Sequence, residues 1–235
     1  MNLNSVIIGG SSGIGLAIAL KLEKSGYDVI VGSRKKTEKL KNISHKFLDV
    51  TNEDSIKFFF ENLQLEYLNS IIYSAGITTA KKSIEHFDEG EYRKVHDVNI
   101  LGAILTLKYA FPYLKKSKGK VVIINSIAGR TYSKFSGFEY TVTKTALSGL
   151  VKQLAVEWAG DEILINSVYP SMVWTSMLEN NVERNTLDLI ENEIPLKRIP
   201  KPDEITSIVE FLVSNKNTYI TGVGIDFNGG QYLTG

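Results

Sequence analysis

The sequence contains no cysteine, no long apolar run and no excess of charge of one sign. Without cysteine the chain forms neither disulfides nor thiolate metal sites, and a chain of 235 residues buries enough surface to be stable without them. No window approaches the roughly 20 apolar residues that span a bilayer, and the start lacks the pattern of a secretory signal. We therefore expect a cytoplasmic protein without a membrane partner.

The charge is nearly balanced, with 27 Lys and Arg against 26 Asp and Glu, which gives +1. Nucleic acids and anionic membranes recruit proteins through clustered cations, so we expect no nucleic-acid partner. The three histidines, His45, His86 and His96, lack the spacing of metal ligands. We accordingly expect no metal site.

Short β-branched runs alternate with amphipathic helical stretches along the chain. The runs are 6–8, 29–31, 70–73, 121–124 and 163–165, and the helical stretches are 14–24, 54–63, 92–114, 143–158 and 203–213. This alternation predicts an α/β fold: one doubly wound Rossmann-type domain over 1–235, with a parallel sheet of about seven strands and helices on both faces. Ligands of such sheets bind beyond the carboxyl ends of the strands.

A glycine-rich loop follows the first run and leads into a helical pattern. Gly9 permits a tight turn, Gly13 lets a pyrophosphate approach the backbone, and Gly15 lets helix and strand pack closely. A simple connecting turn is the alternative, but the strand–loop–helix context favours a dinucleotide site. The residues expected to form it are Gly9, Ser11, Ser12, Gly13, Ile14 and Gly15.

The end of the second run distinguishes between the two nicotinamide cofactors. An acidic residue about 20 positions after the loop would bind the ribose 2′-hydroxyl of NAD(H), whereas a cation accommodates the 2′-phosphate of NADP(H). Ser33 and Arg34 stand there, followed by Lys35 and Lys36, without a carboxylate. We therefore favour NADP(H) over NAD(H), with Arg34 on the phosphate. A solvated basic loop is the alternative.

Tyr140 and Lys144 stand at i and i+4, so they share one face of the helical stretch that follows the run 121–124. An adjacent ammonium would lower the pKa of the phenol and make Tyr140 an acid/base. The Ser126 hydroxyl could hydrogen-bond a developing alkoxide, and Lys144 could also hold ribose hydroxyls. The alternative is a surface Tyr/Lys pair and a serine at a strand end.

Asn99 lies within the apolar helical stretch 92–114. A buried asparagine is unfavourable unless its amide is hydrogen-bonded. It either holds a water that relays protons from Lys144 or satisfies a local break of the backbone, and the sequence leaves both interpretations open.

Together these residues resemble the short-chain dehydrogenase/reductase family, from Ser5 to Gly230. The resemblance implies that Tyr140 is the acid/base, Lys144 its partner and ribose clamp, Ser126 the group that orients the carbonyl, and Asn99 the relay residue. It also implies further cofactor contacts at Asp49, Val50, Ala75, Gly76, Pro170, Val173 and Thr175.

Residues 194–230 are similar to the 3-oxoacyl acyl-carrier-protein reductases. The expected function is therefore NADPH-dependent transfer of a hydride to a carbonyl group, which converts a ketone to a secondary alcohol. The resemblance favours a 3-oxoacyl thioester as the substrate. Reduction of a sugar or another small ketone, or a non-catalytic NADP(H)-binding regulator, are the alternatives. Another Rossmann-type enzyme such as a methyltransferase would leave Tyr140 and Lys144 unexplained.

Several positions depart from the family pattern. Ile8 stands where the family usually has Thr, Tyr73 and Ser74 replace Asn-Asn, and Ser171 replaces Gly. The short interval between Arg34 and Asp49 predicts that the helix between the second and third strands is truncated.

Substrate selection is expected in a lid within 172–199, a segment longer than an ordinary connection that carries Trp174, Met177, Leu178 and Leu187. These apolar residues suit an acyl chain or another partly hydrophobic carbonyl compound. The polar residues of the segment, Glu179, Asn180, Asn181 and Glu183, suit a sugar equally well. The family is commonly oligomeric, so the resemblance implies a homotetramer or dimer built on the stretches 92–114 and 143–158 and the last strand.

Overall fold

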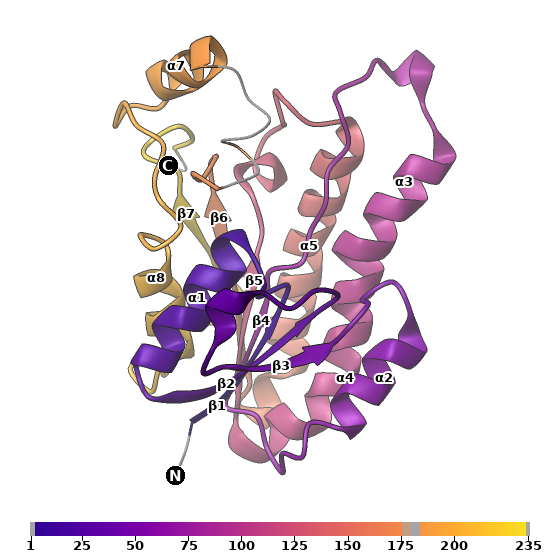
Figure 1. Ribbon diagram of the computed structural model, residues 1–235, viewed down its shortest axis with the longest axis vertical. Coiled ribbons are helices and arrows are strands. Elements are labelled where there is room, and N and C mark those ends of the chain that lie inside the picture. Colours follow the sequence, from indigo (N-terminus) through magenta and orange to yellow (C-terminus); the bar gives the residue numbers. More distant parts are fainter. Residues whose placement is uncertain (1–2, 176–177, 179–183, 234–235) are drawn as a thin grey trace.

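The computed structural model describes residues 3–175, 178 and 184–233. These residues form a seven-stranded sheet in the order β3-β2-β1-β4-β5-β6-β7, in which all neighbouring strands are parallel. Helices cover both faces (Figure 1). The predicted fold class is confirmed. Among the described helices, none has the length and apolar character needed to cross a membrane.

The strands are β1 (Leu3–Ile8), β2 (Tyr27–Ser33), β3 (Ser44–Phe47), β4 (Ser70–Tyr73), β5 (Lys120–Ile124), β6 (Leu164–Pro170) and β7 (Gly224–Phe227). The helices are α1 (Gly13–Lys24), α2 (Glu53–Glu61), α3 (Glu89–His96), α4 (Gly102–Ser117), α5 (Phe138–Glu157), α7 (Arg184–Glu193) and α8 (Thr206–Val213). Shorter helical turns are η1 (Glu38–Leu40), η2 (Ile84–His86), η3 (Asp97–Leu101), η4 (Ile127–Gly129) and η5 (Ala159–Asp161).

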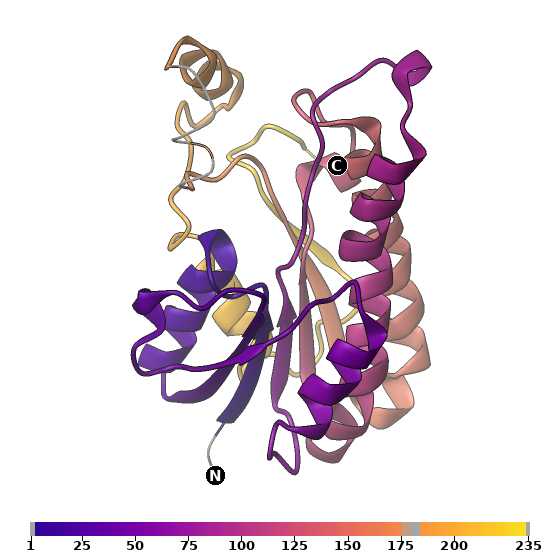
Figure 2. The ribbon, with the colours of Figure 1, turned by 45° about the vertical axis from the view of Figure 1, so that its right-hand side comes forward.

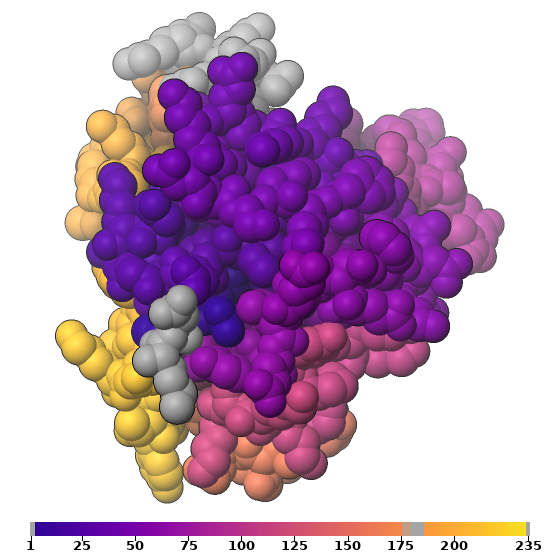
Figure 3. Space-filling view, turned by 60° about the horizontal axis from the view of Figure 1, so that its bottom comes forward, coloured from indigo at the N-terminus to yellow at the C-terminus, as the bar shows by residue number. Residues whose placement is uncertain are grey.

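Two hydrophobic cores hold the layers together, one on each face of the sheet. Residues of α2, α4 and α5 form one core with alternate residues of β1, β4, β5 and β6. Residues of α1 and α8 form the other core with residues of β1, β2, β4, β5 and β6. Figure 2 shows the two helical layers on opposite sides of the sheet. Figure 3 shows the face at the bottom of Figure 1, much of which is formed by the first third of the chain.

The sheet order reverses between β1 and β4, which are neighbours although two strands separate them in sequence. Connections from these two strands leave in opposite directions, which opens a crevice at their carboxyl ends in folds of this kind. Both α7 and the segment between β4 and α3 extend beyond this carboxyl edge, at the top of Figure 1. The candidate site residues should therefore gather below them.

The helical stretch 92–114 is not one helix. It consists of α3, a π-helical turn η3 and α4, joined without a loop. Between β2 and β3 the structure has only the 3₁₀ turn η1, so the predicted truncation of that helix is confirmed. The strands β3 and β7 lie at the two edges of the sheet and correspond to no apolar run in the sequence.

Candidate active site

The glycine loop between β1 and α1 has the close approaches that only glycine allows. Gly9 has a φ of +81° and Gly13 a φ of +52°, both in the left-handed region. A Cβ on Gly9 would lie 2.6 Å from the backbone nitrogen of Ala75, and a Cβ on Gly15 would overlap the Gly9 carbonyl oxygen. The loop is therefore packed backbone to backbone against α1 and the end of β4.

The first turn of α1 offers an anion site. Its leading backbone N–H groups have no partner within the helix, and this end of the helix dipole is positive. Ser12 caps the helix without a side-chain hydrogen bond, and no acidic residue lies in the first turn. Ser11, Ser12 and Ile14 belong to this loop and turn. The arrangement fits the pyrophosphate of a dinucleotide.

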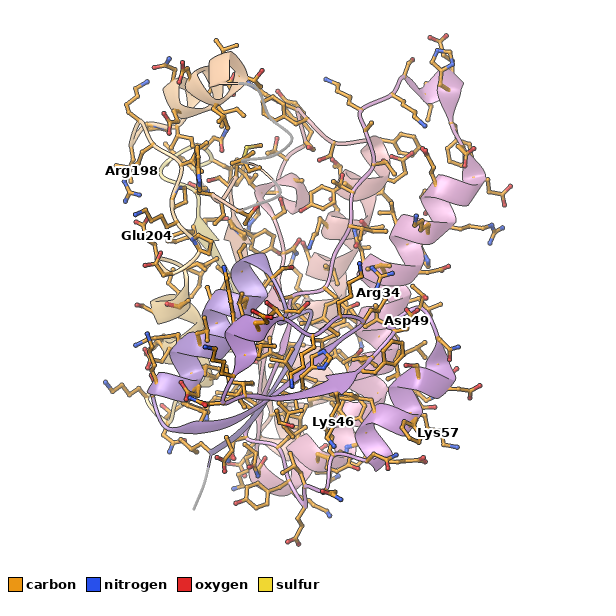
Figure 4. The ribbon with its side chains drawn as sticks, viewed as in Figure 1. Arg34, Lys46, Asp49, Lys57, Arg198 and Glu204 are labelled. Carbon is orange, nitrogen blue, oxygen red and sulfur yellow. The ribbon has the colours of Figure 1, made fainter. Side chains whose placement is uncertain are left out.

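The residues after β2 lie beside this loop. The Gly9 N–H donates to the Gly32 carbonyl at 2.8 Å, and Ser33, the last residue of β2, comes next in the chain. Arg34 is exposed, and Figure 4 shows it close to Asp49. The Thr51 backbone N–H, as the largest cause, and the field of Arg34 both hold the pKa of Asp49 below its ordinary value. Asp49 also accepts from the Thr51 hydroxyl at 2.8 Å, which fixes its carboxylate.

Tyr140, Ser126 and Lys144 converge at the carboxyl end of β5. Ser126 follows β5, caps η4 and accepts from the Ala128 N–H at 3.1 Å. Its hydroxyl hydrogen-bonds that of Tyr140, which lies in the first turn of α5. The Lys144 Nζ lies 5.6 Å from the centre of the Tyr140 ring and donates to the Ile124 carbonyl at 2.9 Å. The three predicted groups are thus brought together.

The pKa of Tyr140 differs from the expectation. Burial raises it above the ordinary value of 10.0, and the hydrogen bond with Ser126 opposes that rise only in part. The pKa of Lys144 falls to about 8 because burial penalises its ammonium. The expectation that Lys144 lowers the pKa of Tyr140 is therefore wrong for this structure. Desolvation is the largest cause of both shifts.

Asn99 is fully buried in the π-helical turn η3. Its Oδ1 accepts from the Ile77 N–H at 2.9 Å, and its Nδ2 donates to the Ile77 carbonyl at 3.0 Å and to the Thr143 hydroxyl at 3.0 Å. The side-chain amide therefore ties the loop after β4 to α5, one residue before Lys144. These bonds reach the loop after β4 and α5 and not the backbone beside Asn99, so neither of the two interpretations left open by the sequence is tested by them.

Tyr73 supports the same turn and was not among the predicted site residues. Its buried hydroxyl donates to the Val98 carbonyl at 2.5 Å, beside Asn99. Desolvation raises the pKa of Tyr73 far above its ordinary value, so it remains a neutral donor. A π-helical turn leaves backbone carbonyls without their usual partners, and such turns occur at functional sites. The aromatic residue in place of the family's usual asparagine satisfies one of them.

The remaining predicted cofactor residues line the same carboxyl edge. Gly76 lies beside Asn99 and Lys144: a Cβ on it would be 3.5 Å from Asn99 Oδ1 and 3.6 Å from Lys144 Nζ, in ordinary van der Waals contact with both. Ala75 packs under Gly9, as described above. The Val50 carbonyl lies against Gly102, at the start of α4, where a Cβ would approach it to 2.9 Å.

The segment after β6 reaches across to the glycine loop. Pro170 ends β6, and Val173 is buried. A Cβ on Gly13 would lie 3.5 Å from the Thr175 side chain, so these two residues face each other. Ser171 donates its backbone N–H to Phe227, and the Trp174 N–H donates to the Pro200 carbonyl at 2.8 Å. The hydrogen bond between Trp174 and Pro200 joins the two ends of the segment 174–200.

Within that segment, Leu178, Leu187 and Ile190 form a small core of their own with Ile194 and Ile199. Met172 and Trp174 pack against it. Arg198 and Glu204 form a two-pronged ion pair at 2.8 and 2.7 Å below α7 (Figure 4). Met177, Glu179, Asn180, Asn181 and Glu183 lie outside the described residues.

Residues 3–175, 178 and 184–233 contain no cluster of three His, Asp or Glu side chains that could hold a metal ion. The polar groups that the site brings together are the Tyr140 phenol, the Ser126 hydroxyl and the Lys144 amine, at the same edge of the sheet as the candidate dinucleotide loop. The glycine cradle, which side chains would fill, and the open first turn of α1 fit such a cofactor.

Comparisons with known proteins agree with this geometry. A family model described as Enoyl-(Acyl carrier protein) reductase matches residues 9–231. The 3-oxoacyl-[acyl-carrier-protein] reductase FabG of Staphylococcus epidermidis is 31% identical over 247 residues, covering 99% of this chain and 100% of that protein. A tropinone reductase homolog of Arabidopsis thaliana is 32% identical over 246 residues, covering 98% of this chain and 92% of that protein.

Among solved structures, ElxO with NADP bound has a TM-score of 0.91 and 29% identity, and the match covers 98% of this chain and 99% of that one. The family match spans nearly the whole chain, and the two curated relatives match it from end to end. The chain therefore belongs to the short-chain dehydrogenase/reductase family of NAD(P)-dependent oxidoreductases, which act on small-molecule substrates.

Proposed function

We propose that this enzyme is an NADPH-dependent carbonyl reductase that converts a ketone to a secondary alcohol. The observation that carries the proposal is the hydrogen bond between Tyr140 and Ser126, with the Lys144 ammonium close by at the carboxyl end of β5. These groups lie at the same edge of the sheet as the glycine loop. A hydroxyl pair of this kind can hold a carbonyl oxygen and supply its proton.

The residues of this chain would act on the oxygen of the substrate. The cofactor, when bound, supplies a hydride to the carbonyl carbon. As negative charge develops on oxygen, the Ser126 hydroxyl donates to it and Tyr140 transfers its proton to it. Lys144 then lies near the resulting phenolate, where a positive charge stabilises it. Gly9, Gly13, Gly15 and the first turn of α1 would hold the pyrophosphate, and Lys144 the ribose hydroxyls.

Asn99 is proposed as a positioning residue for this site. Its three hydrogen bonds fix the loop after β4 against α5, which carries Tyr140 and Lys144. The further cofactor contacts proposed from the sequence are those to Asp49, Val50, Ala75, Gly76, Pro170, Val173 and Thr175. Their common location around the crevice supports these assignments.

We also propose that NADP(H) is preferred to NAD(H). Ser33 and Arg34 stand where an acidic residue would bind a free 2′-hydroxyl, and Arg34 is exposed beside the loop. A guanidinium at this place binds a charged phosphate much more strongly than a neutral hydroxyl. The NADP in the ElxO structure supports the same preference.

A 3-oxoacyl thioester is the substrate class that we propose first. Large apolar side chains are exposed on the segments beyond the carboxyl edge, among them Phe87, Phe135 and Leu189. Such a rim suits a partly hydrophobic substrate, and the separate small core of residues 172–199 supports a lid over it. The similarity to FabG supports the same class. The single-domain organisation, the homo-oligomer and the cytoplasmic location remain predictions.

The test is NADPH consumption with 3-oxoacyl thioesters, keto sugars and diketones. We expect Tyr140→Phe to retain NADPH affinity while kcat falls by about 100-fold or more, since it removes the proton donor. Tyr219→Phe is the matched control, because Tyr219 is 94% exposed on the loop before β7. NADPH binding without turnover on any carbonyl would instead favour the non-catalytic regulator.

A further inference from the structure

The hydroxyl of Ser33 already has two hydrogen-bond partners within the protein. Its Oγ lies 2.9 Å from the Lys35 carbonyl oxygen and 2.8 Å from Nε2 of His45, on the neighbouring strand β3. In the parallel register His45 pairs with Val31, two residues before Ser33, so both side chains lie on the same face of the sheet. His45 belongs to none of the family motifs discussed above.

The hydrogen positions in this cluster follow from the partners. A carbonyl oxygen only accepts, so the Ser33 hydroxyl donates to Lys35. The Ser33 oxygen then accepts from His45, which places a proton on Nε2. The carbonyls of Ser33 and Lys35 also raise the pKa of His45, although burial, the largest effect, lowers it overall.

This tautomer determines what Ser33 can offer a ligand. A phosphate dianion accepts hydrogen bonds and donates none, so Ser33 binds it only by turning its single proton toward it. With Nε2 as the donor, that proton is free to leave Lys35 for the phosphate. With Nε2 as an acceptor, the imidazole would hold the proton and leave a lone pair facing the anion.

We propose that His45 is a positioning residue for the 2′-phosphate of NADP(H). Its Nε2–H occupies one lone pair of Ser33 Oγ, so that the Ser33 hydroxyl donates to the phosphate beside Arg34. His45 touches Ser33, and it acts on cofactor choice through that hydroxyl. The inference rests on the proposed use of NADP(H) and adds a residue on β3 to the discrimination against NAD(H).

The test uses calorimetric titration of the intact protein with 2′,5′-ADP, and with ADP as the ligand that lacks the 2′-phosphate. We expect His45→Leu to weaken 2′,5′-ADP about fivefold to tenfold, since a hydrogen bond to a charged group is impaired. His45→Gln should stay within about twofold of the wild type, because its amide can donate from nearly the same place. The affinity for ADP should remain unchanged in both variants, which also shows that they are folded.

Two comparisons make the result specific. In a Ser33→Ala background, His45→Leu should have no further effect, because its only route to the phosphate has been removed. His86→Leu, on the exposed turn η2, is the matched control and should leave both affinities unchanged.

The inference is overturned if His45→Leu binds 2′,5′-ADP as the wild type does, if it weakens ADP equally, or if its effect persists without Ser33. Failure of the proposed cofactor preference is a different result. In that case the wild type itself would bind 2′,5′-ADP no more tightly than ADP.

Discussion

Replacing Lys144 by methionine is expected to stabilise the protein while it removes activity. Lys144 is only 4% exposed, and burial lowers its pKa from 10.5 to about 8. Since the ammonium is less favourable in the folded than in the unfolded chain, this group opposes folding wherever the unfolded chain keeps it protonated. The loss of folding free energy that Lys144 causes has its full size below pH 8 and disappears as the pH rises from about 8 to 10.5.

The magnitude follows from the shift. A change of 2.5 units, from 10.5 to 8, corresponds to about 3 kcal/mol. Methionine fills a similar volume without charge but loses the hydrogen bond to the Ile124 carbonyl, which has a charged donor at pH 7 and contributes about 1.5 kcal/mol. The free energy of unfolding of Lys144→Met at pH 7 should therefore exceed that of the wild type by about 2 kcal/mol.

Urea unfolding at fixed protein concentration, at pH 6.5, 7.5 and 9.5, measures this difference. The advantage of the variant should shrink at the highest pH, where the wild-type lysine is neutral in the folded state. Lys152→Met is the matched control, because Lys152 lies exposed on the same helix and should change stability by less than about 0.5 kcal/mol. A wild type as stable as Lys144→Met at pH 6.5, with no trend in pH, would refute the reasoning.

The remaining predictions concern the supports of the site. Asn99→Ala should lower the free energy of unfolding by about 2 kcal/mol, since it leaves the half-buried N–H and C=O of Ile77 unpaired; urea unfolding measures it, and an unchanged midpoint would contradict the bonds. Tyr73→Phe should cost about 1–3 kcal/mol by orphaning the Val98 carbonyl, and NADPH titration should stay near wild type. Gly15→Ala should abolish NADPH binding in the same titration, because its Cβ overlaps the Gly9 carbonyl; wild-type affinity would exclude the cradle.

The central strands and the helices beside them were predictable from the sequence. Strands such as β1 and β4 are buried on both faces and therefore read as uninterrupted apolar runs. The edge strands β3 and β7 have no such runs, because each is paired on one side only and half exposed. Their existence depends on the neighbouring strand, which short-range patterns do not contain.

The site was predictable in its residue types and less so in its electrostatics. The positions of Ser126, Tyr140 and Lys144 followed from strand ends and helical spacing. The sequence could not reveal that desolvation raises the pKa of Tyr140 and lowers that of Lys144, since burial is a property of the whole fold. Nor did it indicate that Tyr73 would hold the π-helical turn, because that contact joins β4 to a turn 25 positions away.

The hydrogen bond between Trp174 and Pro200 joins the two ends of the segment that carries α7. Among its described residues, Leu178, Leu187, Ile190, Ile194 and Ile199 form a core of their own, apart from the two cores of the sheet. A foreign loop grafted between these two anchors would leave the Rossmann scaffold intact. New substrate ranges could thus evolve, or be engineered, by exchanging this cassette while the hydride chemistry beneath it stays the same.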